Sequence, residues 1–185
     1  MFRNVVLFLF FLKYKLRYYN KVKFKGYTIV FKFKGSTINI GKGTVINSGF
    51  TSNLLGLFQK TIIISRYGGI INIGENVGIS GSTIYAMSKI SIGNNTMIGA
   101  NCKLLDNDFH PLNSKKRILN NPEDIKKREI SIGNNCFIGM NTIILKGTTI
   151  GDNSIVGAGS VVSGKFKSNS IICGNPAEKI KDNTN

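Results

Sequence analysis

Aliphatic residues recur at every sixth position through the second half of this chain. The run is clearest at Ile132, Ile138, Ile144, Ile150, Val156 and Val162. An α-helix repeats its face about every 3.6 residues and a strand about every 2 residues, so neither element accounts for the spacing. A period of six describes a short strand followed by a turn, with three such units in each coil of a triangular prism. The spacing predicts an all-β fold, a parallel β-helix.

The same period is present earlier in the chain. Its earlier members are Ile40, Ile46, Ile73, Ile79, Ile92, Ile98 and Leu104. Ten of the thirteen aliphatic residues are followed, four positions later, by a small or β-branched residue: Thr44, Val77, Thr83, Thr96, Cys102, Cys136, Thr142, Thr148, Ser154 and Ser160. We expect each aliphatic side chain to stack on its equivalent one coil away, at about 4.8 Å, so that the interior becomes a column of aliphatic groups.

Turn residues and coil number follow from the same pattern. Five asparagines are predicted at the corners, because Asn tolerates the left-handed backbone region: Asn94, Asn95, Asn134, Asn135 and Asn153. The repeat from Ile40 to Phe166 predicts about six coils. The register slips by one residue between Ile73 and Ile92, which indicates a bulge at a corner.

The repeat is interrupted once. After Leu104 the next aliphatic residue is due at position 110, where the chain has His110, and the pattern resumes at Ile132. We therefore predict an inserted loop at residues 106–129, and a loop projecting from a rigid wall is a natural place for chemistry. The predicted organisation is a basic, aromatic segment at 1–36, the β-helix at 37–166 and a C-terminal tail at 167–185.

Positive charge is concentrated in the first half of the chain. The formal net charge is +16, and no Asp or Glu precedes Glu75. Such an excess favours an anionic partner. Nucleic acid is not expected, because no nucleic-acid-binding motif accompanies the charge. The alternating Lys and Phe residues of the first 34 positions fit either strands that cap the β-helix or a segment that lies on an anionic membrane.

The sequence lacks the patterns expected of a membrane-spanning helix, of paired cysteines and of a metal site. The longest apolar run has eight residues, from Val5 to Leu12, whereas a spanning helix needs about 20. Three cysteines without a C-x-x-C pair predict neither a disulfide framework nor a zinc site. A single His excludes metal sites built from several imidazoles, so no metal is expected. We expect a cytoplasmic protein, held at the inner face of the membrane if the basic segment binds lipid.

Three stretches resemble the hexapeptide-repeat acyltransferases, and most closely the maltose/galactoside acetyltransferase-like branch that includes polysaccharide O-acetyltransferases. They are D-N-D-F-H-P at 106–111, the hexads at 132–162 and G-N-P-A at 174–177. The resemblance covers about residues 71–181. It implies a left-handed β-helix, a homotrimer, acetyl-CoA as co-substrate, and a sugar or lipid-linked sugar as acceptor.

The resemblance also implies roles for residues of the inserted loop. His110 matches the histidine that acts as general base in direct acetyl transfer, and an unperturbed imidazole pKa of about 6.5 suits that role. Asp106 and Asp108 are candidates to orient the imidazole or bind sugar hydroxyls, although capping of a turn explains each equally well. Ser82 aligns with an acceptor-pocket position where the family usually has Asn.

For coenzyme A the resemblance implies contacts with the coil wall and the tail. Gly139, Met140, Ala158 and Ser163 match the wall positions. The family commonly has Lys or Arg directly after G-N-P-A, whereas this chain has Glu178 there. Contact with the phosphates is therefore expected from Lys179 or Lys181.

The function expected from these residues is acetyl-CoA-dependent O-acetylation of a sugar or of a polysaccharide precursor of the capsule or O-antigen type. Two alternatives stay open. One is N-acetylation of a nucleotide-linked amino sugar, and the other is a non-catalytic β-helix scaffold. A metal-dependent carbonic anhydrase on the same fold is excluded, because it requires three histidines and this chain has one.

Overall fold

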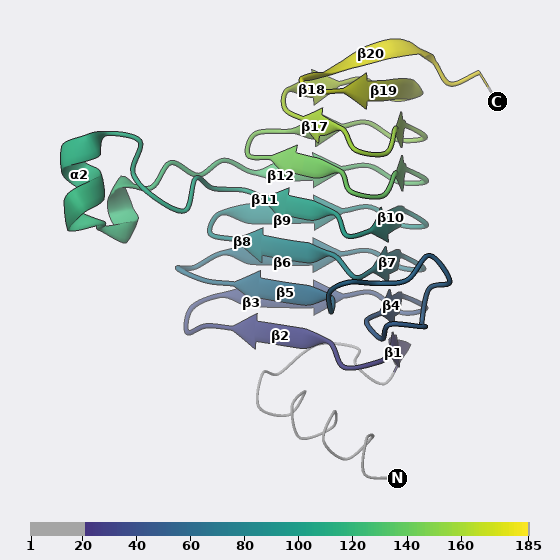
Figure 1. Cartoon of the computed structure of the whole chain (residues 1–185), viewed down its shortest axis with the longest axis horizontal. Coiled ribbons are helices and arrows are strands. Elements are labelled where there is room, and N and C mark those ends of the chain that lie inside the picture. The colour runs from purple at the N-terminus through teal and green to yellow at the C-terminus, as the bar shows by residue number, and fades with distance from the viewer. Residues whose placement is uncertain (1–20, 185) are drawn as a thin grey trace, which may run out of the picture.

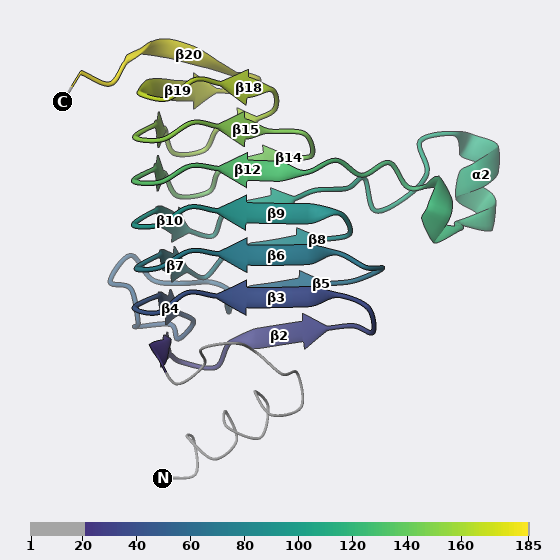
Figure 2. The same cartoon turned by 180° about the vertical axis from the view of Figure 1, so that it is seen from behind.

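The structure is a computed structural model that describes residues 21–184. Three parallel sheets, which we label A, B and C, form the sides of a triangular prism (Figures 1 and 2). In each coil the chain passes from sheet B to sheet C and then to sheet A. Among the described residues, no helix is long and apolar enough to span a bilayer.

The three sheets are built from short strands. Sheet A contains β3 (Thr37–Ile40), β6 (Ile70–Ile73), β9 (Lys89–Ile92), β12 (Ile130–Ile132), β15 (Thr149–Ile150) and β18 (Lys165–Phe166). Sheet B contains β1 (Lys23–Lys25), β4 (Val45–Asn47), β7 (Gly78–Ser80), β10 (Met97–Ala100), β13 (Phe137–Ile138), β16 (Ile155–Val156), β19 (Ser170–Gly174) and β20 (Ala177–Asp182). Sheet C contains β2 (Ile29–Lys32), β5 (Ile62–Ser65), β8 (Thr83–Ala86), β11 (Lys103–Leu105), β14 (Ile143–Leu145) and β17 (Val161–Val162).

The core is the predicted column of aliphatic side chains. All thirteen residues of the six-residue repeat are buried, and each is at most 4% exposed. Their stacking follows the strand register, so that in sheet B Ile79 pairs with Ile98, which pairs with Ile138. The prediction of a parallel β-helix is thus confirmed, because period, burial and register agree.

The corners use asparagine in two ways. Asn95, Asn135 and Asn153 adopt the predicted left-handed conformation, with φ between 54° and 57°. Asn94 and Asn134 do not. Their side-chain oxygens instead accept backbone N–H groups from the neighbouring coil, at 2.8 Å in both cases. Consecutive coils are therefore joined at this edge by side-chain as well as backbone hydrogen bonds.

The slip in the repeat lies at the corners on either side of β8. Ile84, the inward residue of β8, comes five positions after the preceding member of the repeat and eight before the next. The short corner moves the buried small-residue position from Thr83 to Ser82, which is fully buried. The long corner contains Met87 and Ser88, and it is the place where the inserted loop is later attached.

Both ends of the prism differ from a simple repeat. Parallel pairing begins at β1, before the predicted start at residue 37, because Phe24 and Val30 are themselves six apart and point inward. At the other end β20 turns back antiparallel to β19 and closes the prism. The predicted membrane contact of residues 1–34 falls largely on residues 1–20, which lie outside the described part of the chain.

Candidate active site

Residues 106–129 project from the prism as an arm between β11 and β12 (Figure 1). Asp106, at the base of the arm, is fully buried. Its carboxylate accepts the backbone N–H groups of Met87 at 2.8 Å and Ser88 at 2.7 Å. These are the extra residues of the long corner after β8. Asp106 therefore attaches the arm to the neighbouring coil, and it has no contact with an imidazole.

Burial dominates the titration of Asp106. Loss of hydration raises the pKa of its carboxyl group, and the hydrogen bonds that it accepts from Met87, Asn107 and Ser88 lower it in part. Of the two roles expected from the sequence, the structure supports capping of a turn rather than acceptor binding, because both oxygens are already hydrogen-bonded.

The two sides of the arm pair with each other where they leave the prism. The N–H group of Arg128 donates to the carbonyl of Asp106 at 2.8 Å, and that of Asp108 donates to the carbonyl of Lys126 at 3.1 Å. Farther out, the arm contains helix α2 (Ser114–Leu119) and a 3-10 turn, η2 (Pro122–Asp124). The paired base gives the tip a fixed direction away from the prism.

His110 lies on the arm just beyond this paired base. Its backbone N–H donates to the carbonyl of Asp108 at 2.6 Å, and its Nδ1 lies 2.9 Å from Oδ1 of Asn120. Because an amide oxygen only accepts hydrogen bonds, Nδ1 carries the proton in this contact and Nε2 is left with a free lone pair. The imidazole is exposed, so Nε2 is accessible to a proton donor.

Asn120 is a functional candidate that the sequence analysis missed. It ends α2 in the left-handed conformation, with φ 50°, and its N–H donates to the carbonyl of Lys116. The helix end therefore determines where its side chain points, and that direction is toward His110. An Asn after a helical segment is a recognisable C-cap, but nothing in the sequence indicates the histidine contact.

Asp108 is paired with a lysine and does not orient the imidazole through its carboxylate. Its Oδ1 forms an ion pair with Nζ of Lys146, a residue at the same edge of the prism. Its Oδ2 is buried and has no hydrogen-bond partner within the described chain. The contact between Asp108 and His110 is the backbone hydrogen bond described above.

Ser82 lies at the other edge of sheet C. Its hydroxyl donates toward the carbonyls of Ser80 and Gly99, both at 2.9 Å, and accepts the N–H of Cys102 at 2.9 Å. The hydroxyl is fully buried in the wall, and its hydrogen bonds hold two coils together. The residue was expected to help form the acceptor pocket, and in this chain its bonding capacity is used within the wall.

The residues expected to contact coenzyme A are divided between two edges. Gly139, Met140 and Ala158 lie where sheet B turns into sheet C, hereafter the B/C edge, and Gly139 is packed so closely on Ala158 that no side chain fits. Ser163 lies where sheet C turns into sheet A, the C/A edge, from which the arm also projects. Ser163 comes five positions after Ala158, a span of up to about 16 Å along an extended chain.

The two basic residues of the tail lie on β20, on the hairpin that closes sheet B. Lys179 pairs with Asp182 at 2.5 Å, and Lys181 stands opposite Ile171 of β19. Both are exposed. One copy of the chain thus carries two groups of candidate residues, His110 at the C/A edge and the small residues at the B/C edge. We refer to them as the candidate half-sites, and one copy does not bring them together.

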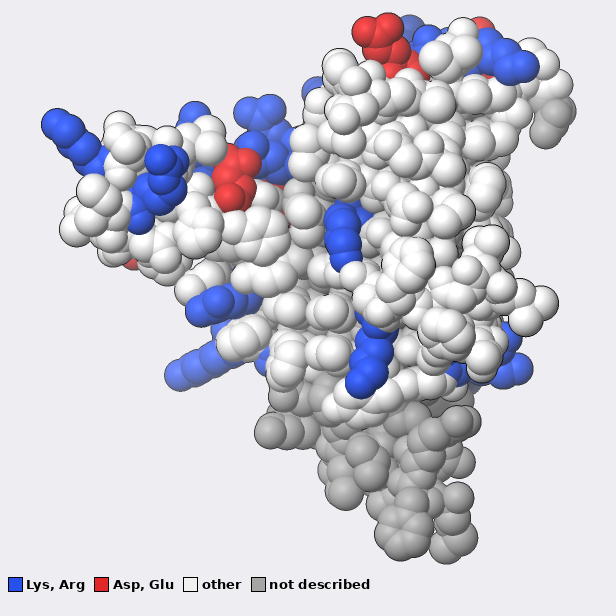
Figure 3. Space-filling view, in the orientation of Figure 1, with Lys and Arg blue, Asp and Glu red and all other residues white. Residues whose placement is uncertain are grey.

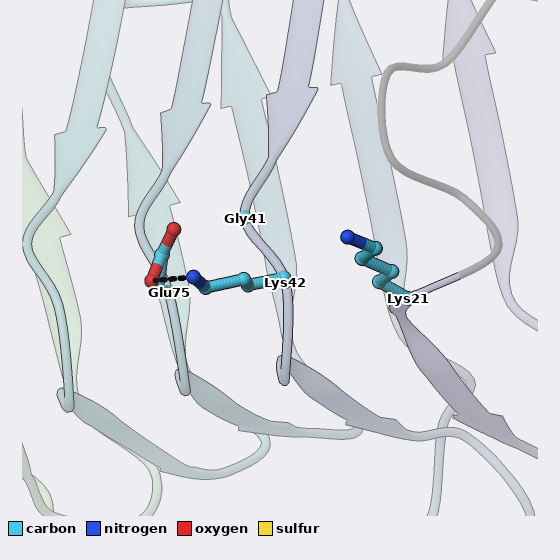
Figure 4. Close-up of a pocket in the computed structure, with 4 residues that line it drawn as sticks. All are labelled: Lys21, Gly41, Lys42 and Glu75. Atoms are coloured by element: carbon cyan, nitrogen blue, oxygen red, sulfur yellow. Dashed lines mark ion pairs between the residues drawn. The ribbon is translucent and has the colours of Figure 1, made fainter.

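Two hollows lie on the surface of the prism, the first where sheet A turns into sheet B and the second at the C/A edge. One, of about 310 Å³, lies near the N-terminal end of the prism between Lys21, Gly41, Lys42 and Glu75, and the Lys42–Glu75 ion pair crosses it (Figure 4). The other, of about 380 Å³, lies beside the arm and is lined by Tyr67, Pro122, Glu123 and Lys127. The second lies beside the arm that carries His110, and Pro122 in its lining follows Asn120 by two positions in the chain.

Cysteines and acidic groups form no further site in the described chain. Cys102 and Cys136 are buried at small-residue positions, and burial raises the pKa of both thiols. Cys173 is exposed and free. Between residues 21 and 184, no three His, Cys, Asp or Glu side chains gather as a metal ion would require.

The anchoring role of Asp106 predicts a pH-dependent effect of Asp106→Asn. Because burial raises the carboxyl pKa above its unfolded value of about 3.9, ionisation costs the folded state more than the unfolded state. The stabilisation contributed by the protonated Asp106 carboxyl group is complete below the pKa of that group in the unfolded chain. It is lost as the pH rises through the pKa of the group in the folded protein. We expect the difference in unfolding free energy between parent and variant, from urea titrations, to shrink over that interval. A difference that grows with pH would contradict this assignment.

Comparison with known proteins gives consistent matches along the prism. The family described as bacterial transferase hexapeptide (six repeats) matches residues 129–164, and the hexapeptide repeat of succinyl-transferase matches residues 89–103. The galactoside O-acetyltransferase of Escherichia coli is 35% identical over 117 residues, which are 63% of this chain and 56% of that protein. The matches span 46% to 61% of the first curated relatives.

Two further proteins match over more of their own length. A Dictyostelium discoideum protein that carries the name of an acetyltransferase is 34% identical over 155 residues, which are 83% of this chain and 80% of that protein. Among solved structures, the polySia specific acetyltransferase NeuO superposes with a TM-score of 0.69 at 25% identity, covering 88% of this chain and 68% of NeuO. The repeats and these neighbours fit a left-handed β-helix.

Proposed function

This chain belongs to the bacterial transferase hexapeptide family, and on that basis we propose that it transfers an acetyl group from acetyl-CoA to a hydroxyl group of a sugar. The observation that carries the proposal is the orientation of His110. Its Nδ1 is occupied by Asn120 at 2.9 Å, so that Nε2 is free at the base of a projecting arm.

The proposed reaction is direct transfer without an acyl-enzyme. Nε2 of His110 accepts the proton of the sugar hydroxyl while the hydroxyl oxygen attacks the thioester carbonyl of acetyl-CoA. The C–S bond then breaks, and the imidazolium returns the proton to the departing thiolate of coenzyme A. Asn120 is a positioning residue in this scheme, because its amide oxygen keeps the Nδ1–H tautomer and leaves Nε2 basic.

The acceptor is proposed to lie between His110 and the hollow beside the arm. Glu123 and Lys127 line the adjacent hollow together with Tyr67, which supports a polyhydroxylated ligand with one apolar face. A carbohydrate has that chemistry, and the galactoside O-acetyltransferase relative supports the same class.

Acetyl-CoA is proposed to lie along the B/C edge, where Ala158 and its glycine neighbours leave the backbone accessible. Lys179 or Lys181 would meet its phosphates, because both are exposed cations on the adjacent hairpin. Ser163 lies at the edge of the arm, so a second copy is needed to bring all these groups to one ligand. We therefore propose a homotrimer in which the arm edge of one copy faces the B/C edge of the next.

The acceptor is further proposed to be held at a membrane, as a lipid-linked sugar would be. Residues 1–34 are rich in lysine, and no Asp or Glu occurs in the sequence before Glu75. Attraction of this segment to an anionic bilayer would raise the local concentration of a membrane-bound acceptor.

The catalytic proposal predicts the behaviour of His110→Ala. Release of coenzyme A thiol from acetyl-CoA should depend on a sugar acceptor in the parent and fall by about 10²- to 10⁴-fold in the variant. Acetyl-CoA binding, measured by calorimetry, should persist. The acceptor panel would include sugars, sugar nucleotides and a nucleotide-linked amino sugar. If the parent neither binds acetyl-CoA nor releases thiol with any acceptor, the scaffold alternative replaces this proposal.

The positioning role of Asn120 predicts a difference between two substitutions. Asn120→Gly keeps the left-handed end of α2 but removes the amide, so kcat should fall about tenfold, the equivalent of one hydrogen bond. Asn120→Asp keeps an acceptor and adds a negative charge, which should move the pH midpoint of kcat/KM upward by stabilising the imidazolium. Parental kcat in the glycine variant together with an unmoved midpoint in the aspartate variant would remove Asn120 from the site.

The two half-sites predict complementation between inactive copies. His110→Ala disables the arm edge, and Ala158→Trp blocks the B/C edge. Random trimers formed by refolding both variants together should regain about a quarter of the parental sites, because each site draws one edge from each neighbour. Either variant refolded alone is the control. Activity that stays at background in the mixture would show that each copy completes its own site.

A further inference from the structure

Four large apolar side chains project into solvent from one loop, residues 48–61, between β4 and β5. We refer to it as the apolar loop. Phe50 is 73% exposed, Leu54 99%, Leu55 65% and Phe58 81%. Single exposed apolar residues are ordinary, but a contiguous group of this size on a soluble protein marks an interaction surface.

Two side-chain hydrogen bonds and one buried leucine hold the base of the apolar loop against the prism. Leu57 is buried beneath it. The Asn53 amide donates to Oγ of Ser80 at 3.2 Å, and the Gln59 amide donates to the carbonyl of Gly81 at 2.6 Å. The loop therefore presents its apolar side chains on a fixed support, ready to contact another phase or molecule.

The surroundings of the apolar loop are cationic. The carbonyl of Lys25 accepts the N–H groups of Ser48 and Gly49, which places this exposed lysine beside the loop. Lys60, at the other end of the loop, lies 5.0 Å from the Tyr27 ring. No carboxylate occurs before Glu75 in the sequence. Figure 3 shows Lys and Arg but no Asp or Glu over the lower part of the prism on that face.

We propose that the apolar loop inserts into the interface of an anionic lipid bilayer. The Phe and Leu side chains would enter the boundary between headgroups and acyl chains, while Lys25 and Lys60 would meet lipid phosphates. An apolar insertion combined with a basic surround is the pair of signals that stable peripheral binding requires. The apolar loop is a membrane element outside residues 1–34, although its neighbour Lys25 belongs to that segment, and the inference does not depend on acetyl transfer.

The apolar loop leaves the B/C edge between β4 and β5, on an earlier coil than Gly139 and Ala158, where the proposed trimer contact lies. Charge favours lipid over a second copy of the chain as the occupant of the loop. The most exposed apolar pair outside the loop lies on α2, at Ile118 and Leu119. It is flanked by Lys116 and Arg117, so docking it on the apolar loop would bring cations of one copy against Lys60 of the next. Like charges would oppose that contact, whereas the cations beside the apolar loop attract an anionic bilayer.

Vesicle binding of the full-length protein tests the inference. Flotation with phosphatidylcholine vesicles, with and without phosphatidylglycerol, would be compared for the parent and for Leu54→Ser combined with Phe58→Ser. We expect the parent to bind the anionic vesicles. The partition coefficient of the double variant should be lower than that of the parent by about tenfold or more. The matched control is Ile118→Ser combined with Leu119→Ser, an equally exposed pair on the arm, which should bind as the parent does.

A second variant tests the charge contribution. Lys25→Gln combined with Lys60→Gln should lower partition to anionic vesicles by about fivefold for each lysine, and Lys115→Gln combined with Lys126→Gln should not. Circular dichroism and thermal melting would establish that every variant is folded, and light scattering would give its mass.

Three outcomes would overturn the inference. The first is a parent that binds neither vesicle type. The second is a loop variant that keeps parental binding, which would assign the lipid contact to residues 1–34 alone. The third is a loop variant that keeps vesicle binding but changes its oligomeric mass, which would make the apolar loop a contact between copies. None of these results bears on acetyl transfer, so failure here is distinguishable from failure of the proposed reaction.

Discussion

The structure depends on the stacking of aliphatic side chains inside the prism. Each inward residue contacts its equivalents in the coils above and below, so Ile138 is held between Ile98 and Val156. This stacking determines strand register, because a shift of one position would turn the whole set of apolar side chains toward water. It also leaves the outer faces and the corners free to vary, and the arm and the apolar loop are both inserted at corners.

The arm shows how a rigid repeat can carry a precise local site. Its base is attached by the buried carboxylate of Asp106, which binds the corner after β8. Beyond that base, the end of α2 turns Asn120 toward His110. Buried Asp106 and left-handed Asn120 thus both help to determine the position of the His110 imidazole. That division of roles explains why a loop with few buried side chains can still orient a histidine.

Much of the fold could be predicted from the sequence, and less of the candidate site. The thirteen repeat residues are all buried as expected, because a six-residue period has one inward position. The prediction was less accurate where the period changes. Around β8 the buried position is Ser82 and not Thr83, since one corner is short and the next is long. Asp106 and Ser82, both considered for the site, use their polar atoms to join coils.

The sequence by itself determined which side chains face inward, where the coil is interrupted and how charge is distributed. These properties are local or periodic, so they are readable along the chain. Only the tertiary structure decided that Nδ1 of His110 meets Asn120, that Asp108 pairs with Lys146, and that the residues expected to bind coenzyme A are divided between two edges. Such contacts join residues that no period relates, and they depend on how the arm and the coils are arranged in space.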